Sequence, residues 1–149
     1  MNLFAKKSMP LAATIAILCG PVHAAEGRWT EGFGQGNLEY FIDKQGYRLN
    51  IGCPTADGSD EASSSVSLSK LRDSSEVSAF TLTAHGITYS APFSTGSRVG
   101  DNNFLSLLDS VRKGDATVKF GKTTIVFPKS NAAKVVPVYG TKNFACNLV

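Results

Sequence analysis

The residues best suited to covalent chemistry in this chain are its three cysteines, Cys19, Cys53 and Cys146. A thiolate is a nucleophile and a metal ligand, whereas two thiols in an oxidising compartment form a disulfide. Cys19 lies in an apolar N-terminal run that we expect to be removed. Cys53 and Cys146 then remain as a widely separated pair without Cys-x-x-Cys spacing, which predicts a structural disulfide. Neither thiol would then be free to act as a nucleophile.

The N-terminus has the layout of a secretory signal peptide. Lys6 and Lys7 form a positively charged start, residues 11–19 (LAATIAILC) are apolar, and the sequence VHA suits a cleavage site after Ala24. The apolar run is about half of the ~20 residues needed to cross a bilayer. We therefore expect residues 1–24 to be removed as a signal peptide.

Cleavage leaves residues 25–149, a length suited to a single secreted domain with its own core. We expect this domain in the periplasm, or alternatively outside the cell, and without stable membrane insertion. Two other interpretations of the N-terminus stay open, namely a helix of the protein core and a lipid anchor attached to Cys19.

A hydrolase would need a nucleophile and a base, and His85 is the only histidine after residue 24. It lies in a predicted tight turn, and no serine lies in a nucleophile elbow. A hydrolase that uses a serine with His85 stays an alternative, because catalytic triads assemble in space rather than in sequence. The residue types otherwise predict a protein that is not an enzyme.

The sequence also lacks the spacing of metal and nucleotide sites. One histidine and two distant cysteines do not make a zinc site, and the acidic run 57–61 (DGSDE) lacks the spacing of a calcium loop. The run 32–36 (GFGQG) precedes a strand instead of following one, and 121–124 (GKTT) lacks the earlier glycine of a phosphate loop. We therefore expect no metal and no cofactor.

The elements that must position these residues are mostly strands. Period-two alternation of apolar and polar side chains predicts strands over residues 37–43, 46–52, 66–71, 77–84, 87–93, 116–120 and 123–127, and a last strand in 143–149. Turns are predicted at Asp43-Lys44-Gln45-Gly46, where the glycine would take a positive φ, and as tight hairpin turns at His85-Gly86 and Gly121-Lys122. The glycine-rich residues 25–36 predict a loop, and residues 130–136 predict a short helical turn capped by Ser130.

Residues 100–114 change to a helical period, with apolar side chains at Phe104, Leu105, Leu108 and Val111. This stripe predicts a helix over about residues 102–113, capped by Asp101 or Asn102 and ended by Gly114. Together these patterns predict a mainly β (β-rich α+β) protein. It would be a single antiparallel domain, sandwich-like or with a curved sheet, with one helix and one disulfide.

The numbers of basic and acidic side chains indicate which classes of partner to expect. Removing Lys6 and Lys7 with the signal peptide leaves 13 basic side chains against 12 acidic ones, which gives no reason to expect nucleic acid or a membrane surface. Residues 112–142, however, hold seven basic side chains and one acidic one. This stretch is either an ordinary solvated face or a site for an acidic partner.

Two polar loops, residues 57–65 and 93–103, are the predicted contact loops for a partner, because binding residues gather on loops held by a rigid scaffold. Together with the basic hairpin, they give the following candidate partner-binding residues: Asp57, Asp60, Glu61, Arg98, Asp101, Lys119, Lys122 and Lys129.

Residues 104–134 (FLSLLDSVRKGDATVKFGKTTIVFPKSNAAK) resemble the C-terminal half of small exported β-domain proteins of the invasion-associated locus B type. In both, a short helix ends in a basic residue and a glycine, and a strand hairpin and a small-residue helical turn follow. The resemblance implies an exported β-domain without catalytic machinery.

These observations predict a non-enzymatic periplasmic binding protein whose partner is another envelope protein. A protein–protein interaction module of the inhibitor or immunity type fits best, and no oligomeric state is indicated. An accessory component of an envelope secretion or conjugation apparatus is the first alternative. The hydrolase that uses His85 is the second.

Overall fold

The computed structural model of the chain describes residues 25–34, 36–55 and 62–148. The predicted signal peptide, residues 1–24, lies outside them. Within the described residues, no helix combines the length and the apolar character that a membrane crossing requires.

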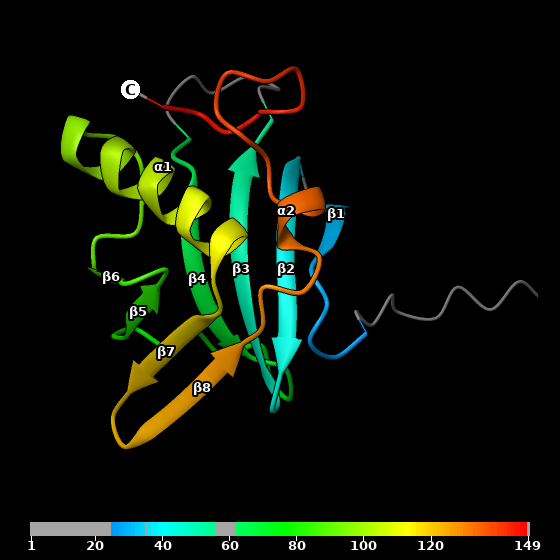
Figure 1. Ribbon diagram of the computed structural model, residues 1–149, viewed down its shortest axis with the longest axis vertical. Helices are drawn as coiled ribbons and strands as arrows, with labels where there is room; N and C mark the ends of the chain where they lie inside the picture. The colour runs from blue at the N-terminus through cyan, green and yellow to red at the C-terminus, as the bar shows by residue number, and fades with distance from the viewer. Residues whose placement is uncertain (1–24, 35, 56–61, 149) are drawn as a thin grey trace, which may run out of the picture.

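In the described part of the chain, eight strands form two four-stranded antiparallel sheets (Figure 1). The first sheet contains, in spatial order, β1 (Thr30–Gly34), β2 (Asn37–Lys44), β3 (Tyr47–Pro54) and β4 (Ser65–Lys70). The second contains β6 (Ile87–Ser90), β5 (Thr81–Ala84), β7 (Ala116–Phe120) and β8 (Thr123–Phe127). Two helices accompany them, α1 (Arg98–Lys113) and α2 (Ala132–Val135). The predicted mainly β, sandwich-like fold is confirmed.

The hydrophobic core lies between the layers. One face of the first sheet is covered by the second sheet toward one end and by α1 toward the other (Figure 1). Apolar side chains of both sheets and of α1 fill this space at less than 2 % exposure, among them Ile42, Leu49, Leu68, Leu82, Val111, Val118 and Phe127. The apolar residues that recur with period two in the strands and with period 3.6 in α1 therefore face one common core.

The three predicted turns are confirmed. Gln45-Gly46 and His85-Gly86 each have positive φ at both residues, and Gly121 has a φ of 51°. Each turn joins two strands that pair in register, as in Ala84 with Ile87. The left-handed backbone that these turns require explains why each contains a glycine.

The glycine-rich N-terminal segment is a strand where the sequence predicts a loop. Residues 30–34 form β1 and pair with β2, with Gly32 opposite Glu39. A side chain at Gly32 would place its Cβ 3.1 Å from the ring of Phe41. The glycine therefore serves the packing of an aromatic ring against the strand, and not a turn.

Helix α1 begins four residues earlier than the sequence predicts. The hydroxyl of Ser97 accepts a hydrogen bond from the N–H of Gly100 at 3.0 Å, so Ser97 is the cap in place of Asp101 or Asn102. Gly114 follows the helix as predicted, but its φ of −144° is extended backbone. A Cβ at Gly114 would lie 3.0 Å from the backbone nitrogen of His85, so close approach to the β5–β6 turn is what requires glycine.

The predicted strands over 77–84 and 87–93 are each divided between the two sheets. Residues 81–84 and 87–90 lie in the second sheet as β5 and β6. Val77 and Phe93 instead bond to the outer edge of β4 in the first sheet. Proline at 92 cannot donate to a sheet, which ends β6 before it.

The C-terminal segment forms no strand within the described residues up to 148, although the sequence predicts one over 143–149. Its alternation of apolar and polar residues therefore reflects contacts of single side chains with the core, such as Phe144 and Leu148. The predicted helical turn at 130–136 is present as α2, with Asn131 at its cap in place of Ser130.

Candidate binding surface

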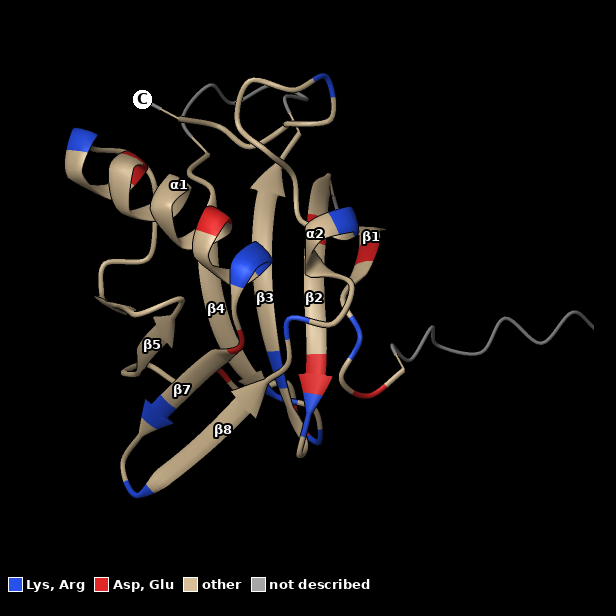
Figure 2. Cartoon of the chain, viewed as in Figure 1, with Lys and Arg blue, Asp and Glu red and all other residues tan. Residues whose placement is uncertain are grey.

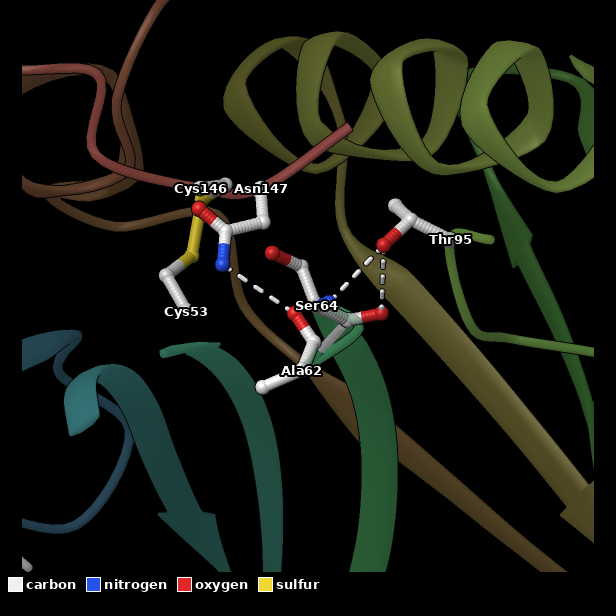
Figure 3. Close-up of a disulfide and its surroundings, with 6 residues drawn as sticks. All are labelled: Cys53, Ala62, Ser64, Thr95, Cys146 and Asn147. Atoms are coloured by element: carbon white, nitrogen blue, oxygen red, sulfur yellow. Dashed lines mark hydrogen bonds between the residues drawn. A yellow bond between two sulfur atoms is a disulfide. The ribbon is translucent and has the colours of Figure 1, made fainter. Parts of the chain in front are cut away.

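The described parts of the two predicted contact loops lie side by side (Figure 3). The N–H of Ser64 donates to the hydroxyl of Thr95 at 2.8 Å, and the N–H of Thr95 donates to the carbonyl of Ser64 at 2.8 Å. Both residues are buried, while their neighbours Ser63 and Ser94 are exposed. We call residues 62–65 and 94–99 together the loop-end surface.

The predicted disulfide is confirmed and lies beside this surface. The sulfur atoms of Cys53 and Cys146 are 2.01 Å apart, and both residues are buried. Cys53 is the next-to-last residue of β3, and the bond fixes the C-terminal segment against the end of that strand. The next residue, Asn147, donates from its side-chain amide to the carbonyl of Ala62 at 3.1 Å (Figure 3).

The start of α1 completes the loop-end surface. Arg98 and Val99 are exposed there, and the Val99 side chain keeps 68 % of its accessible area. Asp101 is buried, and its carboxylate accepts from the N–H of Gly96 at 3.3 Å, so it holds the loop. Val99 was missed by the sequence analysis because it lies outside the apolar stripe of the helix.

The other predicted partner-binding residues are not part of this surface. Lys119, Lys122 and Lys129 are exposed on or beside the β7–β8 hairpin, whose tip lies at the opposite end of the molecule from the start of α1 (Figures 1 and 2). Along the ribbon, basic residues occur on both helices, on this hairpin and at the ends of β2 and β3, so they come from several separate elements (Figure 2). Asp57, Asp60 and Glu61 lie outside the described residues.

His85 is exposed in the β5–β6 turn, with no hydrogen bond to a serine among the described residues. The described residues also contain no group of three or more histidine, cysteine, aspartate or glutamate side chains placed to hold a metal ion.

A groove of about 290 Å³ adjoins the loop-end surface along the outer edge of β4. It shares Ser65 and Ser94 with that surface. Phe80 and Phe93 form part of its wall, with ring centroids 4.5 Å apart and planes within 5° of parallel. The sequence analysis missed this groove because its walls come from segments that are far apart in the chain.

A family model described as YfjT matches residues 27–136. The match contains all the described strands and both helices, and it ends before the C-terminal segment that carries Cys146. No curated protein matches the chain, and no solved structure matches it.

Proposed function

The chain belongs to the YfjT family, and we propose that it is a non-enzymatic binding protein exported to the bacterial periplasm. Its partner would be another envelope protein, bound in the manner of an inhibitor or immunity protein. The observation that carries this proposal is the loop-end surface, where two polar loops are held together in one exposed, fixed arrangement.

The fixed arrangement matters because binding costs free energy when loops must be ordered. At the loop-end surface, hydrogen bonds already hold the two loops in place: a pair between Ser64 and Thr95, and one from Asn147 to Ala62. Exposed groups remain for a partner, including the guanidinium of Arg98 and the apolar side chain of Val99. A partner could cover the Val99 side chain and pair with the guanidinium of Arg98 in one contact.

The side chains available for chemistry favour binding over hydrolysis. Both cysteines are buried in the disulfide, which removes the strongest nucleophile from residues 25–148. His85 is exposed, and no hydrogen bond joins it to a serine among the described residues, so the structure offers no pairing that would activate a serine hydroxyl there. The disulfide also favours an oxidising compartment, in agreement with the predicted signal peptide.

Capture experiments with the protein purified from the periplasm test the proposal. The recovered chain should begin at Ala25, and it should capture one envelope protein from a periplasmic extract. Arg98→Glu and Val99→Asp place new negative charge on the loop-end surface and should each reduce capture strongly. Lys122→Glu makes a similar charge change at the distant β7–β8 turn and should capture as the unmodified chain does.

The proposal fails if the unmodified chain captures no envelope protein. It also fails if Arg98→Glu and Val99→Asp capture as much as Lys122→Glu, because the loop-end surface would then not be the contact.

A further inference from the structure

The groove lies beside the outer edge of β4, and the middle of that edge is not paired with another segment among the described residues. Two isolated bridges, Ser65 with Ser94 and Ser69 with Glu76, cover the two ends of the outer edge of β4. Between them, the N–H of Val66 donates to Phe93 and the carbonyl of Leu68 accepts from Val77, at 2.9 and 2.8 Å. The strand edge is therefore paired at both ends and open at its centre.

Two backbone groups of β4 face this opening. In an antiparallel sheet, alternate residues direct both their N–H and their C=O to the same side. Val66 and Leu68 direct theirs away from β3, so the carbonyl of Val66 and the N–H of Leu68 point to the groove. Neither group has a hydrogen-bond partner among the described residues, and Val66, which lines the groove, leaves its carbonyl as an acceptor for a ligand.

The walls of the groove combine aromatic rings with one negative charge. Phe80 and Phe93 are half-buried and present a stacked pair of rings. Glu76 is the only charged residue in the lining, and its carboxylate has no ion-pair partner in the described part of the chain. In the neighbouring turn, by contrast, Arg72 lies 3.7 Å from Asp73. The remaining polar lining is hydroxyl groups of serines.

We propose that this groove binds an arginine side chain of the protein partner. A guanidinium group is planar, carries five N–H donors and stacks on aromatic rings. Its charge complements the unpaired carboxylate of Glu76, its donors fit the carbonyl of Val66 and the serine hydroxyls, and its apolar stem fits beside Phe80 and Phe93. The inference rests on the proposed function, since the arginine belongs to the partner bound at the adjoining loop-end surface.

A small probe tests the groove without the partner. N-acetyl-arginine amide is titrated into the full exported protein and followed by backbone amide NMR shifts. We expect saturable shifts at Ser67, Glu76, Phe80 and Phe93. The citrulline analogue has nearly the same shape without the charge and should give no saturable shifts, and the lysine analogue should bind more weakly than arginine because its ammonium is not planar.

Substitution of the carboxylate gives the second part of the test. Glu76→Gln keeps the size of the side chain and should weaken binding of N-acetyl-arginine amide by roughly fivefold, as expected for an exposed ion pair. Glu31→Gln removes an exposed carboxylate of β1, far from the groove lining, and should leave the affinity unchanged. Both variants remove only a surface charge, so both should fold.

Equal binding of the arginine and citrulline analogues, or equal affinity of Glu76→Gln and the unmodified chain, would overturn the inference. Shifts confined to other parts of the protein would overturn it as well. If the probe does not bind but envelope-protein capture persists, the inference is wrong and the proposed function stands. If the probe binds but capture is absent, the proposed function is wrong and the groove remains a guanidinium site.

Discussion

Tyr40 shows how one buried side chain makes stability depend on pH. The residue is 2 % exposed, and burial, with a smaller effect from the carboxylate of Glu31, raises the pKa of its hydroxyl to about 12. The folded protein therefore holds this proton more tightly than the unfolded chain, whose tyrosine has a pKa near the ordinary value of 10.0. The corresponding stability is fully present below pH 10 and is lost as the pH rises through about 12.

We expect the free energy of unfolding to fall between about pH 9 and about pH 11, and Tyr40→Phe to reduce this fall because phenylalanine has no proton to lose. Urea unfolding at the two pH values measures the difference. Tyr139→Phe is the matched control, since Tyr139 is 63 % exposed and should leave the pH dependence unchanged. An equal fall in Tyr40→Phe and the unmodified chain would contradict this assignment.

Single residues also explain where the sequence analysis succeeded and where it did not. The turns at Gln45-Gly46 and His85-Gly86 were predictable because the required backbone is a local property of the glycine and its neighbour. Gly32 was misleading, because the ring of Phe41 that requires it belongs to another strand. Gly100 is likewise needed for close packing, since a Cβ there would collide with the carbonyl oxygen of Ser94.

At the scale of elements, the side chain of Asn131 joins the N-terminal segment to the start of α2. Its Oδ1 accepts from the N–H of Trp29 and its Nδ2 donates to the carbonyl of Trp29, each at 2.9 Å. The Asn131 side chain thus satisfies both backbone groups of Trp29, as a residue of a neighbouring strand would do. This contact spans 102 positions of the chain, so no local pattern in the sequence could reveal it.

Asn131→Ala should lower the free energy of unfolding by about 1–3 kcal/mol, because a part-buried donor and acceptor of Trp29 lose their partners. Urea unfolding followed by tryptophan fluorescence measures this directly. Asn102→Ala is the matched control, as Asn102 is exposed on α1. If the two variants unfold at the same urea concentration, the contact contributes nothing to stability.

Whole elements were predictable when they form between neighbours in the chain. The β2–β3 and β7–β8 hairpins lie close to their predicted bounds, because alternation and turn residues are both local signals. The start of α1 was predicted too late, since Arg98, Val99 and Gly100 do not continue the apolar stripe. The candidate loops were predictable from composition, but their contact through Ser64 and Thr95 was not, because it joins residues 31 positions apart in the chain.

At the scale of the whole molecule, the disulfide is the largest single constraint on the unfolded chain. It joins residues 93 positions apart, and closing such a loop is worth about 4–5 kcal/mol in the chain-entropy model. Reduction should therefore lower the free energy of unfolding by about that amount. Urea unfolding of the exported protein with and without reductant measures the difference, and mass spectrometry of that protein, which lacks Cys19, should detect no free thiol before reduction.

The double variant Cys53→Ala/Cys146→Ala is the control for this measurement. It should unfold at the lower urea concentration in both conditions and should not respond to the reductant. A stability of the unmodified chain that is equal with and without reductant would contradict the role given to the disulfide.

The order of strands in the two sheets affects the order in which the sheets can fold. In the first sheet, β1 to β4 pair strictly with their neighbours in the chain, so each pairing closes only a short loop. In the second sheet, β7 pairs with β5, and the chain between them contains β6 and all of α1. Short loops close faster than long ones. We therefore expect the first sheet to form as a meander before the second sheet, whose central pairing of β5 with β7 also requires α1 to be in place.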